Sequence, residues 1–180
     1  TVFDRMSGLA RELGAINLGQ GFPDEQGPPE IIAAAARALA ERSNQYPPSL
    51  GLPELRDAVA AFYGRRQELA LSRDQVVVTS GATEGIAAAV LALVAAGDEV
   101  ILFQPAYDAY APMVRRAGGV PVSVPLSPPD WRYRAADLEA AITPRTSLLI
   151  FNDPLNPAGT VAGEAELAAI ADACQRHDLR

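Results

Sequence analysis

Residues 97–124, GDEVILFQPAYDAYAPMVRRAGGVPVSV, decide the fold class of this 180-residue chain. They start with a nearly continuous apolar run at 99–103, pass through a helical stretch at 107–117, and end in the β-branched run 120–124. Apolar strands that alternate with helices are typical of a parallel sheet covered on both faces. This stretch therefore predicts one strand–helix–strand unit of an α/β fold.

The same alternation extends in both directions along the chain. Further strands are predicted at 75–79 and 147–151, and helices at 30–42, 53–62, 83–96, 135–142 and after 163. Pro121 places the strand at 120–124 at an edge of the sheet, because proline cannot donate a ladder hydrogen bond. The sequence thus predicts a three-layer α/β fold, a mostly parallel sheet between two layers of helices. An extended arm with turns is expected over residues 1–30.

Composition and charge exclude several classes of function. All fifteen positively charged side chains are arginine, so mechanisms that need a Schiff-base, P-loop or general-base lysine are closed to this chain as given. The net charge of −7 and the scattered arginines argue against nucleic acid or an anionic membrane as a partner. The longest uncharged apolar run, 86–96, is too short to cross a bilayer and predicts a buried helix.

The cysteine content and the chain ends suggest a location and a boundary. One cysteine, Cys174, cannot form an internal disulfide, and the first residues lack a signal-peptide pattern, so a cytoplasmic location is expected. The chain does not start with methionine, and a helical pattern continues to Arg180 without a stop signal. We therefore expect the chain to be a piece of a longer protein.

Ligands of open α/β sheets bind where strands end, so the residues that follow each predicted strand are the candidates for a site. Residues 81–83 open a helix and offer backbone N–H groups to a phosphate, or form a plain turn that Thr83 caps. Tyr107 follows the next strand, where it stacks on a planar ligand or fills the core. Asn156 lies between two prolines after the last strand, either as a rigid hydrogen-bond donor or in an ordinary Asn turn.

Other reactive side chains point to no site. His177, the only histidine, lies in a polar stretch and is expected on a solvated helix surface. Cys174 is expected to pack inside the same helix. Ser80 lacks the G-x-S-x-G elbow of serine hydrolases, and no metal-ligand spacing occurs in the sequence.

Several short motifs, in this order, resemble the N-terminal half of class I/II pyridoxal-phosphate aminotransferases of fold type I. They are NLGQGFPD at 17–24, NQY at 44–46 followed by GLPELR at 51–56, VTSGATE at 78–84, GDEV at 97–100, PAYD at 105–108 and NDPLNPAG at 152–159. The resemblance leans towards the kynurenine, glutamine and methionine aminotransferase branch. Asp153 and Leu155 depart from the commoner form of the last motif, which has a small polar residue and Asn there.

The resemblance assigns roles to individual residues around the cofactor, pyridoxal 5'-phosphate. The implied cofactor contacts are the backbone of Gly81, Ala82 and Thr83 to the phosphate, Tyr107 stacked on the pyridine ring, and Asn156 to the phenolic oxygen. Tyr46 would reach the phosphate of the neighbouring subunit's cofactor, which implies a homodimer with shared active sites. The backbone of Gly21 would lie against the substrate carboxylate.

The resemblance also implies a domain plan. Residues 1–45 would form an N-terminal arm and a small-domain segment, and residues 46–180 a large cofactor-binding domain whose C-terminal part is missing. In the family's sheet, strands from that missing part separate the strand at 75–79 from the other three, so it would lack neighbours here. The family's Schiff-base lysine, its substrate-carboxylate arginine and the aspartate at the pyridine nitrogen come later in the chain, so no catalytic residue is expected here.

The function implied by the resemblance is transfer of an amino group between an amino acid and a 2-oxo acid, in amino acid metabolism. The 180-residue chain alone is expected to be inactive, because it has no lysine. Two alternatives remain open. A C–S lyase could use the same fold and cofactor, and a non-catalytic module could use the phosphate cradle for another phosphorylated ligand or for a partner.

Overall fold

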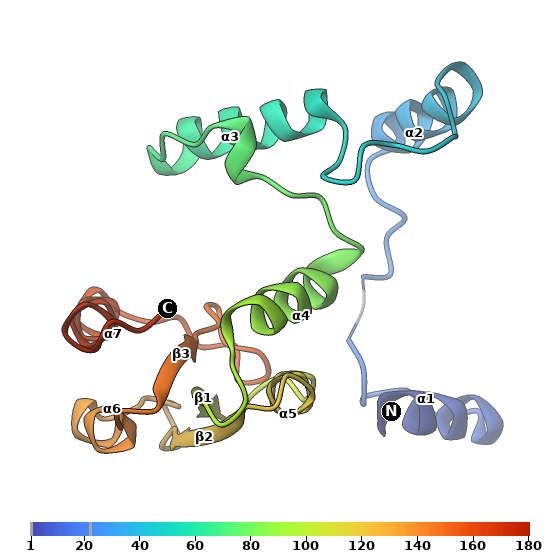
Figure 1. Cartoon of the computed structure of the whole chain (residues 1–180). Coiled ribbons are helices and arrows are strands. Elements are labelled where there is room, and N and C mark those ends of the chain that lie inside the picture. The colour runs from blue at the N-terminus through green and yellow to red at the C-terminus, as the bar shows by residue number, and fades with distance from the viewer. Residues whose placement is uncertain (1, 22) are drawn as a thin grey trace. The chain divides into compact units, whose positions relative to one another are not determined.

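A computed structural model describes residues 2–21 and 23–180 of the chain (Figure 1). Contacts divide the chain into two compact units, Thr1–Leu52 and Pro53–Arg180.

The first unit contains helix α1 (Val2–Leu13) and helix α2 (Pro29–Glu41). Helix α2 was expected, and it begins with proline at its first position and Glu30 in its first turn. Helix α1 corrects the prediction of an extended arm over residues 1–30. Its apolar side chains recur at helical spacing, at Val2, Met6, Leu9 and Leu13, a pattern that the sequence analysis overlooked.

Glycine ends helix α1 in a defined way. Gly14 has a φ of +60°, and the N–H of Ala15 donates to the carbonyl of Ala10 at 2.9 Å. A left-handed glycine followed by this hydrogen bond is the common C-terminal stop of a helix. The loop that carries residues 17–21 therefore leaves the helix in a fixed direction.

The second unit contains a parallel sheet, as the sequence predicts. Strands β1 (Glu99–Gln104), β2 (Val120–Pro125) and β3 (Thr146–Ile150) form one 3-stranded sheet in the order β2-β1-β3. The three strands confirm the predicted runs to within one residue at each end. Pro121 lies in β2, an edge strand, as its missing N–H requires.

Helices cover both faces of this sheet. Helices α4 (Gly81–Leu93) and α5 (Tyr110–Arg116) lie on one face, and α6 (Ala135–Ala141) and α7 (Glu164–His177) on the other (Figure 1). The central strand β1 shows why: Val100 and Leu102 pack towards α4 and α5, whereas Ile101 and Phe103 pack towards α6 and α7. Successive side chains of a strand point to opposite faces, so a strand that is apolar throughout needs cover on both.

The predicted strand at 75–79 is wrong. After helix α3 (Pro53–Gln67), the short 3-10 helix η1 (Arg73–Gln75) ends and the backbone becomes extended, with φ −119° and ψ 127° at Val76. Within the described residues no strand pairs with this segment, and Val77 and Val78 are 55% and 39% exposed. An extended segment becomes a strand only when a neighbour supplies its hydrogen bonds, as the resemblance to the family's sheet anticipated.

Two of the predicted helices differ in detail. Helix α5 begins only at Tyr110, because residues 105–109 form a turn after β1. Helix α4 was expected to be buried, yet Val90 is its only buried residue, and Leu91 is 60% exposed.

Candidate functional site

The order of the strands places a candidate site between the ends of β1 and β3. From β1 the chain passes through α5 to β2 on one side, whereas β3 lies on the other side of β1 and is reached through α6 on the opposite face. Connections that diverge in this way leave a crevice at the carboxyl ends of the strands, where open α/β sheets bind ligands. Tyr107 follows β1 and Asn156 follows β3, so both lie at this edge.

Helix α4 brings its first turn to the same edge. The helix precedes β1 and packs on it, with Val90 and Val94 in one cluster with Val100. Ile86, near the beginning of α4, packs against the same cluster as Tyr107. The helix therefore runs opposite to β1, and residues 81–83 lie towards the carboxyl edge.

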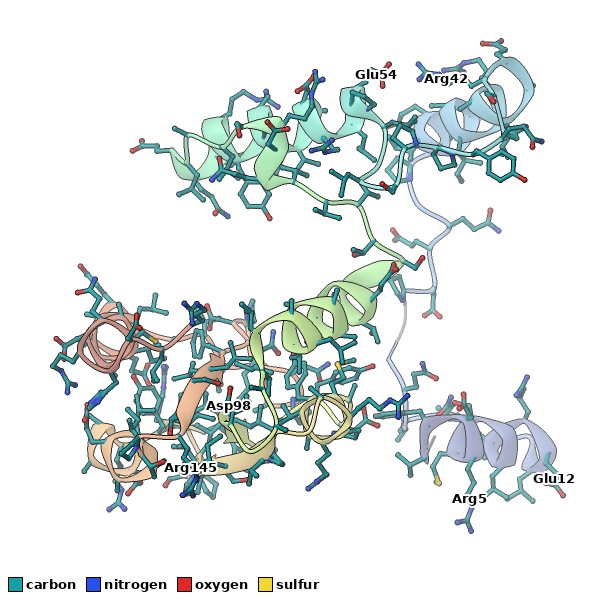
Figure 2. All side chains as sticks on the ribbon, in the orientation of Figure 1. Arg5, Glu12, Arg42, Glu54, Asp98 and Arg145 are labelled. Carbon is teal, nitrogen blue, oxygen red and sulfur yellow. The ribbon has the colours of Figure 1, made fainter. Side chains whose placement is uncertain are left out.

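The opposite edge of the sheet carries a different set of side chains. Asp98 and Arg145, both labelled in Figure 2, directly precede β1 and β3 and mark the amino edge. There the buried carboxylate of Glu99 accepts hydrogen bonds from Arg145 and Thr143. The hydrogen bond from Thr143, and then Arg145, hold the pKa of Glu99 below its usual value against the opposing effect of desolvation. This ion pair joins β1 to the turn before β3 and is remote from the candidate site.

The first turn of α4 has the geometry of an anion site. Gly81 adopts a φ of +75°, and its N–H donates to the carbonyl of Thr79 at 2.8 Å. Ser80 holds the N-cap position, so the alternative with Thr83 as the cap is wrong. The N–H groups of Ala82 and Thr83 belong to the first turn, which has no intrahelical acceptors for them, and both residues are exposed.

The surroundings of Gly81 leave room for a ligand. A Cβ on Gly81 would meet no described atom within 4 Å beyond its two chain neighbours and the nearby backbone of its own helix. The carboxylate of Glu84 turns back on this helix end and accepts a hydrogen bond from the N–H of Ser80. A carboxylate at this position reflects the preference of a helix N-terminus for negative charge.

Tyr107 takes part in the core, one of the two roles that the sequence left open, and its stacking on a planar ligand stays a prediction. Its ring packs edge-on against Tyr110, with centroids 5.6 Å apart, and touches the cluster beneath α4 and α5. It remains half-buried, unlike Tyr110, whose pKa is raised by burial and then by the neighbouring Tyr107. The ring is thus supported from within the protein while part of it stays open to solvent.

Asn156 lies in a loop whose backbone is closed by hydrogen bonds. Its own N–H donates to Oδ1 of Asn152 at 2.8 Å, and the N–H of Leu155 donates to the carbonyl of Thr160 at 2.9 Å. The N–H of Ala162 donates to Oδ1 of Asp153, also at 2.8 Å. The Asn156 carboxamide is exposed and has no hydrogen-bond partner in the part of the chain that the structure describes.

Asn152 and Asp153 hold the loop around Asn156 through their side chains, and the sequence did not predict this role. Asn and Asp frequently accept hydrogen bonds from nearby backbone N–H groups, which was the available signal. The substitution of Asp153 for the small polar residue of the commoner motif thus has a structural use, because its carboxylate closes the loop on Ala162.

Gly21 and Tyr46 belong to the first unit, so their predicted roles stay predictions. The loop before Gly21 is held by Asn17, whose Nδ2 donates to Oγ of Ser7 at 3.0 Å and whose Oδ1 accepts from the N–H of Gly19 at 3.0 Å. Gly21 is exposed, and Tyr46 is 96% exposed. Phe22, within the same motif, lies outside the described residues.

The remaining reactive residues lie away from this edge. His177 lies on the polar surface of α7, with Nε2 3.3 Å from Glu139, as expected from the sequence. Cys174 packs against the cluster beneath α6 and α7, and burial raises the pKa of its thiol. Residues 2–21 and 23–180 contain no group of three or more potential metal ligands. No helix among them is both long and apolar enough to span a membrane.

Comparisons with known proteins identify relatives of this chain. Residues 14–180 match the family model for aminotransferase class I and II. A probable N-succinyldiaminopimelate aminotransferase, DapC, of Mycobacterium tuberculosis is 53% identical over 178 residues, covering 96% of this chain and 44% of that protein. The methionine aminotransferase of Escherichia coli is 41% identical, covering 99% of this chain and 47% of that protein.

Solved structures show the same relation. The N-succinyldiaminopimelate aminotransferase of M. tuberculosis matches with a TM-score of 0.96 at 50% identity, over 99% of this chain and 47% of that one. The E. coli protein YbdL, reported with a methionine aminotransferase function, matches with a TM-score of 0.94 at 42% identity, over 99% of this chain and 48% of that one. The chain thus spans about half the length of the relatives it matches, with the α/β architecture of their fold type. Because the family model covers most of its residues, the chain belongs to the class I and II aminotransferases, a family of pyridoxal-phosphate enzymes.

Proposed function

We propose that the protein containing this chain transfers an amino group between an amino acid and a 2-oxo acid, with pyridoxal 5'-phosphate as cofactor. One observation carries the proposal. The first turn of α4, Tyr107 and Asn156 come from separate parts of the sequence and all lie towards the carboxyl edge of the sheet.

The residues at this edge fit the cofactor. The phosphate needs hydrogen-bond donors, which the N–H groups of Ala82 and Thr83 supply beside the open space at Gly81. The pyridine ring needs a planar support, which the half-exposed ring of Tyr107 supplies. The phenolic oxygen needs a donor, which the unpaired carboxamide of Asn156 supplies.

These residues bind and orient the cofactor but do not perform the proton transfers. When bound, pyridoxal phosphate accepts the electron density that develops at the substrate's α-carbon. The Asn156 carboxamide would donate to the phenolic oxygen, and Tyr107 would keep water from one face of the ring. The chain has no lysine, so covalent attachment of the cofactor and movement of the α-proton need a residue that this chain does not contain.

Two of the proposed roles fall on residues of the first unit. We place the backbone of Gly21 against the substrate carboxylate and Tyr46 at the phosphate of the partner subunit's cofactor, in a cytoplasmic homodimer with shared sites. We retain 1–45 as the arm and small-domain segment and 46–180 as the cofactor-binding domain, near the contact boundary at Leu52.

An assay of the full-length protein tests the proposal. N-succinyldiaminopimelate, methionine and kynurenine, the amino compounds in its relatives' names, would each be offered with 2-oxoglutarate and pyridoxal phosphate. Amino transfer to 2-oxoglutarate from at least one donor is expected. The variant Asn156→Ala should bind the cofactor more weakly, whereas Arg66→Met, an exposed change on α3, should not.

Controls separate the alternatives. Product formation that does not depend on an added oxo acid would support a lyase instead. A full-length protein that neither binds pyridoxal phosphate nor transfers an amino group to 2-oxoglutarate would overturn the proposal.

A further inference from the structure

In the loop after β3, the side chain that contacts Asn156 directly comes from Asn152, next to the end of the strand. Strand β3 ends at Ile150, and Asn152 follows it almost directly. Oδ1 of Asn152 accepts the backbone N–H of Asn156 at 2.8 Å. This contact spans the turn between the sheet and Asn156. The position of the Asn156 backbone therefore depends on the side-chain amide of Asn152.

Asn152 lies beside packed side chains. It is half-buried and lines a pocket together with the apolar side chains of Phe103, Tyr133, Phe151 and Leu155. Phe103 and Phe151 pack edge-on with centroids 5.8 Å apart, and Tyr133 donates its O–H to the carbonyl of Glu166 at 2.6 Å. The acceptor therefore sits on the packed part of the second unit.

Asn156 has no comparable support of its own. Its side chain is exposed and makes no hydrogen bond to any described residue, so only its backbone is anchored. The direction of the Asn156 carboxamide thus depends on where its N–H is held. A displacement of a binding group by about 1 Å weakens a preorganised site substantially.

We propose that Asn152 is a positioning residue for the cofactor, because the hydrogen bond from the Asn156 N–H to its Oδ1 aims the Asn156 carboxamide at the phenolic oxygen. The inference rests on the proposed function. It assigns Asn152 an effect on cofactor binding that passes through Asn156 and no other residue.

Paired variants of the full-length protein isolate this contact. Asn152→Leu keeps the approximate size and shape but removes the acceptor, whereas Asn152→Asp keeps an acceptor oxygen. Val161→Thr is the matched control, because Val161 lies in the same loop, is 56% exposed and has nearly the same shape as threonine. The single variant Asn156→Ala and the double variant that combines Asn152→Leu with Asn156→Ala complete a double-mutant cycle.

Two properties of the cofactor would be measured, its dissociation constant and the pH midpoint of its visible absorption band. Asn152→Leu should raise the dissociation constant roughly fivefold, as expected for the loss of one hydrogen bond, and Asn152→Asp should restore most of the affinity. The pH midpoint should move in the same direction as in Asn156→Ala. In the double variant the effects should not multiply, because Asn152 acts through a side chain that is already absent.

Specific results would overturn the inference. They are a dissociation constant for Asn152→Leu equal to that of Val161→Thr, no restoration by Asn152→Asp, or independent effects in the double variant. If Asn152→Leu does not fold, Asn152→Ala takes its place in the same cycle. A wild-type protein without affinity for pyridoxal phosphate would overturn the proposed function and this inference together, whereas normal binding with silent Asn152 variants would overturn this inference alone.

Discussion

Arg56 offers the sharpest test of how the approach to α4 is held in place. Its side chain is 7% exposed, on a helix whose other described residues are not buried. The guanidinium donates from Nε to the carbonyl of Val76 at 2.7 Å and from NH2 to the carbonyl of Arg73 at 2.8 Å. These hydrogen bonds join α3 to the segment that leads into the first turn of α4.

The variant Arg56→Met keeps the apolar stem and removes both donors. Hydrogen bonds from a charged group contribute about 1.5 kcal/mol each at the lower end, so the loss of two should lower the free energy of unfolding by about 3 kcal/mol. The nearby Asp74 carboxylate, 3.6 Å away, adds little because its side chain is 94% exposed. Arg56→Lys should recover part of the loss, because one ammonium cannot reproduce the planar fork of arginine.

Urea denaturation of the full-length protein measures this difference. Arg66→Met, on the exposed surface of the same helix, is the matched control and should change the free energy of unfolding by no more than about 0.5 kcal/mol. The m-values should agree between variants, so that midpoint shifts report stability. If Arg56→Met and Arg66→Met unfold with the same free energy, the reasoning from the buried guanidinium is refuted.

Three further predictions concern the packing and titration of the second unit. Leu138→Ala should lower the free energy of unfolding by about 2–5 kcal/mol in urea, because Leu138 is 1% exposed; Leu91→Ala, at a 60% exposed position, should cost clearly less. The lowered pKa of Glu99 means that its stabilising effect is complete above the ordinary value of 4.5 and is lost as the pH falls through the lower, folded-state pKa. The stability difference between the wild type and Glu99→Gln should therefore shrink below pH 4.5, and a constant difference down to acid unfolding would contradict this. Burial raises the pKa of Cys174, so iodoacetamide at pH about 8 should modify it more slowly in the folded protein than in urea, and equal rates would argue against burial.

Local patterns in the sequence were sufficient for most of the second unit. The strands at 99–103 and 120–124 were predictable because a run of apolar residues bounded by glycine and proline has few ways to bury itself. The edge position of β2 followed from Pro121 alone. Helix α1 was predictable in principle, since Val2, Met6, Leu9 and Leu13 recur at helical spacing. The many glycines and prolines after residue 18 led instead to the prediction of an extended arm over the whole of residues 1–30.

The candidate site was only partly predictable. Residues 81–83 begin a helix, and Tyr107 and Asn156 each follow a strand, and these properties can be found in the sequence. Their location at one edge follows from the crossover of the chain from β2 over β1 to β3. The support from Asn152 was not predictable as a specific contact, because an Asn side chain has several backbone donors within reach and folding selects one.

Composition and periodicity were enough to predict the α/β class, the edge position of the strand that holds Pro121 and the absence of a lysine nucleophile, because they depend only on the residues and their order. Only the tertiary structure shows that Arg56 is buried with its guanidinium on the carbonyl of Val76, and that Asn152 accepts a hydrogen bond from the N–H of Asn156. Each of these depends on which group lies opposite in space. A hydrogen bond needs its partner within about 3 Å, and only the folded chain sets that distance.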